Sequence, residues 1–523
     1  MFKRFAFLVM LMAIALSAAS GAPTASGQNT SWPANDWPTS TPEAQGMHSG
    51  ELAAFFETWS QPHFNFDSMV VVRHGTIVAE AYGPLTQPET IREMASCSKS
   101  VTSALAGVLL QEGLLDSLDT PILEFFPDMT TQNVDAKKQA VTVRDLLTMS
   151  SGIECNDVIM ETTEDWLQYA LDLPISGEPG EQWNYCNAPV HILSGMITQL
   201  TGMSAADYAA EKLFAPLGIT DYTWTGSPTG ITLGYSDLKL SARDMAKFGY
   251  LYLNDGQWEG QQIIPADYAQ ASLASQIATQ WDAIGYGFLW WHFEPINVTY
   301  ALGWAGKYIL LLPDKDMVVV LTSAMTQGIN TGLQHFPLMF AAISLTAAEE
   351  PLPDNGEAFE RLQTVLQNIH EPSAQPVPLL PAVAAEVSGQ RYGLSATDLF
   401  LSSEGYKRFA NYYGVADKLG VNWLKLDFDE SAEAVLTFGF TDNQAWSVPV
   451  GLDGLYRVSE GRTGAVGAKG EWLGDDLFRV YLLQNSDPFQ HRFDFNFMPG
   501  GVYIISYEYA SGGANAVQGV LMQ

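Results

Sequence analysis

Hydrophobic and polar positions in the first two thirds of the chain follow strand-like and then helix-like patterns. The run 67–83, DSMVVVRHGTIVAEAYG, consists of two β-rich stretches around His74-Gly75, which predicts a β-hairpin. After Ser96, leucine and valine recur at helical spacing as far as Gly113, which predicts one buried helix. Helical patterns then occupy most of the chain to about residue 275.

Strand patterns return at 300–304, 308–313 and 317–323, and a helical pattern follows at about 331–347. A hairpin at one end of this region and strands at the other predict one antiparallel sheet that is assembled from both ends and flanked by helices, with a helical insert between them. The fold class expected for residues 46–350 is therefore α+β.

A proline-rich segment, 351–382, separates this region from a stretch with a different pattern. Beyond it, short runs such as NWLKLDFD, AVLTFGF and HRFDFNF, several of them alternating in polarity, are separated by Gly, Asp and Asn turns. They predict a second domain at 383–523, an antiparallel β-barrel or sandwich, with 351–382 as the linker.

The first 22 residues combine Lys3 and Arg4, the apolar run FAFLVMLMAIAL and the small residues SAASGA, which are the three parts of a secretory signal. We therefore expect an exported protein, periplasmic or extracellular; an uncleaved membrane anchor is the alternative. Residues 23–45, rich in Ser, Thr, Pro and Asn, predict a flexible leader. No later run reaches ~18 uninterrupted apolar residues, so no stable membrane span is expected after removal of the signal.

Composition limits which partners, disulfides and cofactors the protein can have. The net charge of −33 argues against a nucleic-acid partner and leaves the oligomeric state open. With three cysteines, at most one disulfide forms; Cys155 with Cys186 is the favoured pair, which leaves Cys97 as a small buried residue, and three free thiols are the alternative. Neither HExxH nor CxxC occurs, so no metal or other cofactor is expected.

The first candidate chemistry is Ser96-Cys97-Ser98-Lys99. Residues at i and i+3 lie on the same side of a helix, so Lys99 can take the proton of the Ser96 hydroxyl as that hydroxyl attacks a carbonyl. A neutral lysine needs its pKa lowered from ~10.4 to ~7, roughly 4.6 kcal/mol, which burial and nearby cations must supply. The pattern indicates an acylating serine hydrolase.

The same spacing occurs at Ser236-Asp237-Leu238-Lys239, so spacing alone does not decide. Ser236 precedes Ser241-Ala242-Arg243-Asp244, an N-cap pattern that opens a surface-type helix, which predicts that Lys239 is a solvated loop residue. Ser96, in contrast, lies at the entrance of a core helix.

Two further segments carry candidate groups. Tyr185-Cys186-Asn187 lies in a loop that ends at a helix, where the tyrosine can shuttle a proton and Asn187 can donate to a substrate carbonyl. A packed ring with a capped hydroxyl is the alternative. Gly303-Trp304-Ala305-Gly306-Lys307 lies between two strands, where glycine permits close approach and a following N–H can face an oxyanion. A β-bulge without function is the alternative.

Together these segments resemble the motifs of penicillin-recognising serine hydrolases, a group with class C β-lactamases, penicillin-binding D-alanyl-D-alanine carboxypeptidases, secreted esterases and 6-aminohexanoate-oligomer hydrolases. Ser96 and Lys99 match the SxxK motif, and Tyr185 and Asn187 match YxN. Trp304-Ala305-Gly306 stands in the place of KTG. LLTMSSGI and SARDMAKFGYLYLNDGQW are also similar to family segments, and the resemblance extends over most of the first domain.

The resemblance implies a β-lactamase/transpeptidase-like fold and an acyl-enzyme mechanism. In that mechanism Ser96 is the nucleophile, Lys99 its general base and Tyr185 a proton shuttle. Asn187 positions the substrate, and the backbone N–H groups of Ser96 and Lys307 form the oxyanion hole.

The chain departs from the family at Trp304, where β-lactamases and carboxypeptidases usually have Lys or His. A cation there binds the substrate carboxylate and helps to keep the catalytic lysine neutral. The departure favours a less anionic ester or amide substrate, peptide-like or with a D-amino acid. The residues expected to bind it, besides Asn187, are Trp304, Gly306, Lys307, Tyr286 and Trp291.

Other functions stay open. A D-alanyl-D-alanine carboxypeptidase or weak β-lactamase uses the same three motifs. An inactive hydrolase-like protein, whose β domain binds a lipid or a glycan, is a different class of answer. A conventional Ser/His/Asp hydrolase is disfavoured, because no GxSxG occurs in the chain.

Overall fold

The computed structural model describes residues 32–33, 36–60, 66–324, 343, 347–396, 420–429, 431–441, 443–461, 464–484, 490–508 and 514–522. The expected signal segment lies outside these residues, and so does the expected helix at 331–347 except for Ile343 and Ala347. Across the described ranges, no helix combines the length and the apolar character needed to cross a membrane.

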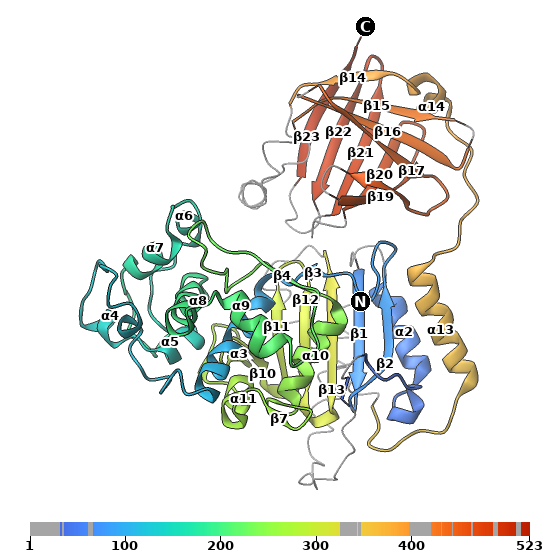
Figure 1. The fold of residues 1–523 in the computed structure, drawn as a ribbon. Coiled ribbons are helices and arrows are strands. Elements are labelled where there is room, and N and C mark those ends of the chain that lie inside the picture. The colour runs from blue at the N-terminus through green and yellow to red at the C-terminus, as the bar shows by residue number, and fades with distance from the viewer. Residues whose placement is uncertain are drawn as a thin grey trace.

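The first domain is built on an antiparallel sheet, which has eight strands in the described part of the chain (Figure 1). The N-terminal hairpin pairs with the last strand, so that Val70 lies opposite Val320. This confirms the prediction of one antiparallel sheet assembled from both ends. In order across the sheet the strands are β2 (Thr76–Tyr82), β1 (Phe66–Arg73), β13 (Met317–Ser323), β12 (Lys307–Leu312), β11 (Val298–Gly303), β10 (Trp291–Phe293), β9 (Ile284–Tyr286) and β8 (Ile277–Ala278).

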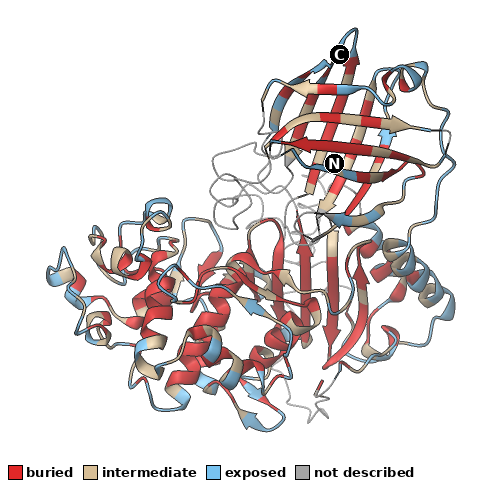
Figure 2. Ribbon diagram, turned by 45° about the horizontal axis from the view of Figure 1, so that its top comes forward, coloured by how far each residue is buried: buried red, intermediate tan, exposed pale blue. Residues whose placement is uncertain are grey.

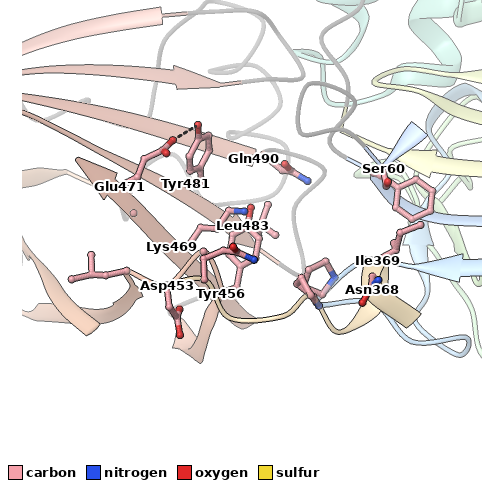
Figure 3. A pocket seen from close by; sticks show the side chains of 18 of the residues that line it. Ser60, Asn368, Ile369, Asp453, Tyr456, Lys469, Glu471, Tyr481, Leu483 and Gln490 are labelled. Carbon is pink, nitrogen blue, oxygen red and sulfur yellow. Dashed lines mark hydrogen bonds between the residues drawn. The ribbon is translucent and has the colours of Figure 1, made fainter. Parts of the chain in front are cut away.

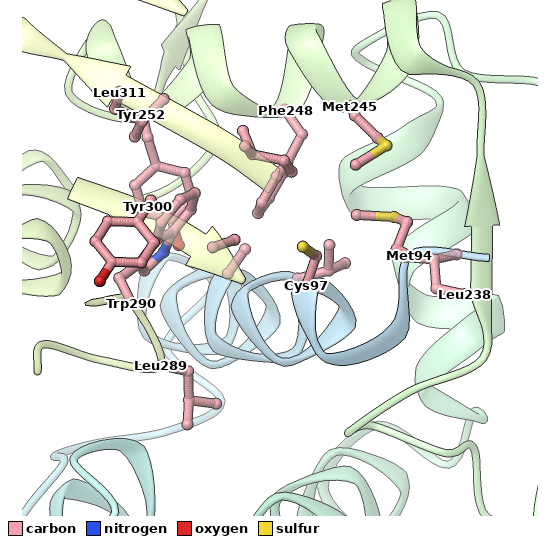
Figure 4. Packing of buried hydrophobic residues seen from close by; sticks show 14 of the residues in the cluster. Met94, Cys97, Leu238, Met245, Phe248, Tyr252, Leu289, Trp290, Tyr300 and Leu311 are labelled. Carbon is pink, nitrogen blue, oxygen red and sulfur yellow. The ribbon is translucent and has the colours of Figure 1, made fainter. Parts of the chain in front are cut away.

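Helices pack tightly on this sheet. Helix α10 (Ala242–Leu253) lies so close to β12 and β13 that a side chain at Gly249 would press on Ile309 and Val318. Figure 4 shows Cys97, at the start of α3 (Ser98–Gln111), and Phe248 of α10 in one apolar layer. Every residue of β12 and β13 is consequently buried (Figure 2), as expected for strands with both faces covered.

Along the chain, most other helical elements of this domain come between the N-terminal hairpin and the later strands of the sheet, and they form the predicted helical insert. They are η4 (Ile122–Phe125), α4 (Ala136–Ala140), α5 (Val143–Leu147), α6 (Asp157–Met160), α7 (Trp166–Asp172), α8 (Ala188–Thr201), α9 (Ala205–Ala209), the π-helical turn η5 (Ala210–Phe214) and α11 (Ala266–Leu273). The insert also holds the short strands β4 (Thr223–Trp224), β5 (Leu238–Leu240), β6 (Gln257–Trp258) and β7 (Gln261–Gln262).

The described part of the segment predicted as a flexible leader packs on the first domain from Trp32, whose ring lies 5.6 Å from that of Tyr250. Trp37 is 4 % exposed, and its indole N–H donates to the Arg243 carbonyl at 3.1 Å. Thr39 forms a β-bridge with Ile77, and the turn η1 (Glu43–Gln45) precedes helix α2 (Ser49–Trp59). Burial of the Trp37 ring outweighs the polar composition of this stretch.

The second domain is a closed β-barrel, one of the two forms that the sequence predicts. A parallel bridge between Gly451 and Lys469 joins β17 to β19, so that nine strands of the described residues close a ring whose other eight pairings are antiparallel. The fully buried side chains of Phe438, Val480 and Phe493 belong to its core. Over the described residues the interior is therefore packed with side chains.

Most strands of this domain are seven to nine residues long. Helix α14 (Ala382–Val387) precedes them, and β18 pairs with β19 outside the ring. The strands are β14 (Arg391–Leu394), β15 (Val421–Phe428), β16 (Glu433–Phe440), β17 (Ala445–Gly451), β18 (Arg457–Gly461), β19 (Gly464–Trp472), β20 (Leu477–Gln484), β21 (Gln490–Met498), β22 (Gly501–Glu508) and β23 (Ala514–Leu521).

The predicted linker contains a helix, α13 (Gly356–His370), which packs on α2. Leu362 is completely buried, and Arg361 forms an ion pair with Glu57 of α2 at 2.9 Å. Because α13 contributes to the core of the first domain, the connection between the domains begins only after it.

A cleft of about 720 Å³ lies between the end of α13 and the outer face of the barrel (Figure 3). Asn368 lines it from α13 and Lys469 from β19, where the ammonium lies 4.7 Å from the centre of the Tyr456 ring. Carboxylates line it too, so the cleft carries both signs of charge: Glu57, Asp453 and Glu471.

Candidate active site

The candidate nucleophile lies in a tight turn between strand β3 (Arg92–Glu93) and helix α3. Residues Ala95–Cys97 form the 3-10 turn η3, and Ala95 has a left-handed backbone with φ of 48°. Ser98 Oγ donates a 2.7 Å hydrogen bond back to the Ala95 carbonyl. Ser96 is partly exposed while the residues on both sides are buried, so Ser96 is the part of the turn open to solvent.

Lys99 lies one helical turn after Ser96. Its ammonium donates to Ser96 Oγ at 2.9 Å and to the Tyr235 carbonyl oxygen at 3.0 Å, and the residue is only 1 % exposed. Burial lowers the pKa of Lys99 to about 7, against the opposing charge of Asp157 and other acidic neighbours. Burial is thus the main cause of the lowered pKa, whereas the sequence predicted a contribution from nearby cations as well.

Tyr185 contacts both of these groups. Lys99 Nζ lies 4.9 Å from the centre of the Tyr185 ring, and the hydroxyl is hydrogen-bonded to Ser96. Burial raises the pKa of Tyr185, so this hydroxyl stays protonated at neutral pH. Burial therefore favours the uncharged form of both groups, the protonated hydroxyl of Tyr185 and the neutral amine of Lys99.

The aromatic residues expected to line the site lie beneath Tyr185. Its ring stacks on Trp291 with centroids 5.6 Å apart and meets Tyr286 edge-on at 6.5 Å. Tyr286 is 1 % and Trp291 5 % exposed, so these two rings support Tyr185 and do not present a binding surface. Trp183 and Trp281, which the sequence did not single out, pack on the same rings and are partly exposed.

The segment after Tyr185 is held by a disulfide and a carboxylate. Cys186 is bonded to Cys155, 31 residues earlier in the chain. One Asp157 oxygen accepts hydrogen bonds from the N–H groups of Asn187 at 3.2 Å and Ala188 at 3.3 Å, where helix α8 begins. Asn187 is partly exposed at this helix start. Asp157 and the two sulfur atoms form a group that could hold a metal only if the disulfide were reduced.

The third segment is the hairpin turn between β11 and β12. Gly303 pairs with Lys307, and the turn between them has left-handed backbone at Ala305, with φ of 61°, and at Gly306, with φ of 88°. Ser323 Oγ donates to the carbonyls of Ala305 and Gly306 at 3.1 and 2.9 Å. Trp304, at the start of the turn, is partly exposed.

This hairpin lies directly against the nucleophile turn. A Cβ at Gly303 would overlap the Met94 carbonyl oxygen, and Cys97 Sγ donates to the Lys307 carbonyl at 3.5 Å. The Lys307 side chain is buried and its ammonium donates to the Ser323 carbonyl at 2.6 Å. Only the backbone of Lys307 is thus available for an oxyanion.

The second SxxK match is not a helical turn. Its last two residues belong to strand β5, which pairs with β3 and β4. The helix that follows, α10, is mostly buried against the sheet and is not the surface helix that the sequence predicts. The Tyr235 carbonyl that anchors Lys99 immediately precedes Ser236, and because it is a backbone group, no residue type in the sequence could reveal it.

The Ser96 hydroxyl contacts both a buried lysine one helical turn later and a tyrosine hydroxyl. This arrangement is suited to nucleophilic catalysis by a serine. The family model described as Beta-lactamase matches residues 53–342, more than half of the chain. The chain belongs to the beta-lactamase family.

Relatives in this family are distant. The chain is 23 % identical over 290 residues to 6-aminohexanoate-dimer hydrolase of Paenarthrobacter ureafaciens, across 49 % of this chain and 72 % of that protein. It is 23 % identical over 303 residues to a beta-lactamase of Yersinia enterocolitica, across 53 % and 73 %. Among solved structures, a Bacillus anthracis protein provisionally named 6-aminohexanoate-dimer hydrolase superposes with a TM-score of 0.52 at 20 % identity, across 62 % and 90 %. The fold is thus β-lactamase/transpeptidase-like.

Proposed function

We propose that this chain is an exported acyl hydrolase that cleaves an ester or amide through an acyl-enzyme on Ser96, with Lys99 as general base. The observation that carries the proposal is the 2.9 Å contact between Lys99 Nζ and Ser96 Oγ, made by a buried lysine with a pKa of about 7. At neutral pH about half of such lysines are uncharged and able to take the serine proton.

The reaction has two matched halves. Ser96 Oγ bonds to the substrate carbonyl carbon while its proton passes to Lys99, and the resulting oxyanion faces the N–H groups of Ser96 and Lys307. Collapse of this intermediate breaks the bond to the leaving group, which takes a proton from Lys99 through the Tyr185 hydroxyl. Water then attacks the acyl-enzyme by the same route, which releases the acid and restores Ser96.

The charges around the site favour a substrate without a carboxylate. The acidic groups that act on Lys99 are Asp157, Glu93 and Glu161, and Trp304 stands where a cation is usual. An anionic β-lactam or a D-alanyl-D-alanine terminus would therefore be acylated slowly. The relative named 6-aminohexanoate-dimer hydrolase supports an ester or amide substrate. So does a 24 % identity over 199 residues to esterase EstB of Burkholderia gladioli, across 32 % of this chain and 49 % of that protein.

Export is supported by two independent features. Residues 1–22 have the composition of a secretory signal. The Cys155–Cys186 disulfide belongs in an oxidising compartment, where disulfides persist.

Labelling with a fluorophosphonate probe, read by intact-protein and peptide mass spectrometry, tests the proposal together with hydrolysis of p-nitrophenyl esters. The wild-type protein should gain one adduct on Ser96 and Ser96→Ala none. Ser236→Ala, which removes the serine of the second SxxK match, should label like wild type. Absence of both an adduct and ester turnover in the wild-type protein would overturn the proposal.

A further inference from the structure

A buried carboxylate lies directly behind the nucleophile turn. Glu93, the last residue of β3, is 6 % exposed. Its Oε1 accepts hydrogen bonds from the N–H of Ala95 at 2.7 Å and from the N–H of Asp237 at 3.1 Å. No step of the proposed reaction uses this side chain, and it contacts the backbone on both sides of the site.

The first hydrogen bond fixes the turn that presents Ser96. Ala95 has φ of 48°, a conformation that an L residue keeps only when its surroundings impose it. Glu93 holds the N–H of that residue, and Ser98 Oγ holds its carbonyl at 2.7 Å. The orientation of the next N–H, that of Ser96, follows from this turn, and Ser96 N–H is one of the two oxyanion donors.

The second hydrogen bond fixes the segment that presents the Tyr235 carbonyl. Asp237 also has a left-handed backbone, with φ of 70°. Its N–H is held by Glu93, and the next residue, Leu238, accepts at its carbonyl from Met94 N–H at 2.8 Å. Figure 4 shows Met94 and Leu238 side by side near the start of α3. One carboxylate thus connects the segment that carries the serine with the segment that anchors the lysine.

The charge of Glu93 also reaches the base. Burial, opposed by the charge of Lys307, raises the pKa of Glu93 to about 7, and the Asp237 carboxylate acts in the same direction as burial. The groups whose charge acts on Lys99 are Asp157, Cys97, Glu93 and Glu161. The rings of Tyr185 and Tyr235 lie 4.9 and 5.7 Å from its ammonium. The negative charge of Glu93 favours the protonated form of Lys99, so removing that charge lowers the pKa of Lys99.

We propose that Glu93 is a positioning residue that holds the Ser96 turn and the Tyr235 segment in register through its two backbone hydrogen bonds, an inference that rests on the proposed roles of Ser96 and Lys99. Glu93 touches neither the substrate nor the reacting atoms. It acts through the geometry of the nucleophile turn and of the carbonyl that anchors the base, and its charge adjusts the protonation of that base.

Two substitutions separate the hydrogen bonds of Glu93 from its charge. Glu93→Ala removes the acceptor, so kcat for a p-nitrophenyl ester should fall ~100-fold with little change in KM, the effect of a slightly misplaced catalytic group. Glu93→Gln retains an accepting oxygen and replaces Oε2, which has no hydrogen-bond partner among the described residues. It should keep kcat within ~10-fold of wild type and move the acid limb of the kcat/KM profile to lower pH.

Glu43 provides a matched control, because it is also a buried glutamate that accepts a backbone N–H, at 2.9 Å from Ser49. Glu43→Ala should lower the unfolding temperature and leave kcat and the acid limb unchanged. Wild-type kcat in Glu93→Ala, or an unmoved acid limb in Glu93→Gln, would overturn the inference. If Glu93→Ala does not fold, Glu93→Gln decides alone. Failure of the wild-type protein to label on Ser96 would instead overturn the proposed function.

Discussion

At the scale of single residues, the burial that lowers the pKa of Lys99 also lowers the free energy of unfolding. Its pKa is about 7 in the folded protein and ~10.4 in an unfolded chain. Between these values the unfolded chain binds a proton that the folded protein does not bind, so the free energy of unfolding rises with pH over this window. Below pH 7 the folded protein carries the full penalty of a buried charge.

Replacing this lysine with an apolar residue should therefore stabilise an inactive protein. Lys99→Met should reduce acylation of Ser96 by at least ~1,000-fold and raise the free energy of unfolding at pH 7 by about 1–2 kcal/mol, the relief of burial less the lost hydrogen bond to Tyr235. Denaturant unfolding between pH 6 and 10 checks this. A variant that is less stable than wild type, or that keeps the wild-type slope with pH, would contradict the prediction.

Under the proposed function, Trp304 limits how anionic a substrate the site accepts. Trp304→Lys introduces a charge that can pair with a substrate carboxylate, so the rate of penicillin acylation should rise ~10-fold or more. Fluorescent penicillin followed over time on a gel measures the rate. Trp304→Ala, which opens the same space without adding charge, is the control and should not show the increase. An unchanged rate in Trp304→Lys would remove this explanation of substrate preference.

The sequence predicted those parts of the site that are formed by side chains only a few residues apart in the chain. Ser96 and Lys99 meet because three residues make nearly one helical turn, which needs no knowledge of the rest of the fold. The Tyr235 carbonyl and the two backbone bonds of Glu93 depend on how β5 pairs with β3, and residue types do not encode that pairing. Tyr286 was expected to bind the substrate. Its depth beneath Tyr185, which rules this out, is likewise set by tertiary packing.

At the scale of elements, the hairpin of β11 and β12 lies against the turn that carries Ser96, and under the proposed function it shapes the oxyanion hole. Gly303→Ala would push a methyl group into the Met94 carbonyl and the side chain of Ala95, so η3 must shift. The kcat for an ester substrate should fall ~100-fold, with a smaller effect on KM. Gly356→Ala, at the start of α13, meets no atom within 4 Å and is the control. A Gly303→Ala enzyme with wild-type kcat would show that this contact does not position Ser96.

The sequence predicted those elements whose hydrophobic pattern lies within one short segment. The hairpin at 67–83 and the helix after Ser96 were recognisable because each has its own hydrophobic period, and both are present as β1, β2 and α3. Helix α13 was missed, because prolines on both sides of it made 351–382 resemble one linker. Closure of the barrel depends on a bridge between Gly451 and Lys469, two residues without any pattern that links them.

At the scale of the whole molecule, α13 determines where the chain can be divided. A protein that ends at Glu371 keeps α13 on α2, and it should fold and hydrolyse p-nitrophenyl esters if the barrel does not contribute to the site. A protein that ends at residue 350 loses Leu362 from the core and should unfold at a temperature lower by ~5 °C or more.

Calorimetry and ester hydrolysis on both truncated proteins and on the full chain check these outcomes. Equal unfolding temperatures for the two truncated proteins would show that α13 does not belong to the first domain. Loss of ester hydrolysis in a folded protein ending at Glu371 would assign the barrel a part in the active site.

The single disulfide also has a consequence for how the enzyme matures. Three thiols allow three different one-disulfide products, and two of them use Cys97, which adjoins Ser96 and is buried in the finished protein. A disulfide between Cys97 and either other cysteine would remove Cys97, and with it the nucleophile turn, from the core. The Cys155–Cys186 disulfide instead holds the segment that carries Tyr185. The yield of active enzyme after oxidation therefore depends on whether Cys97 is buried before the thiols pair.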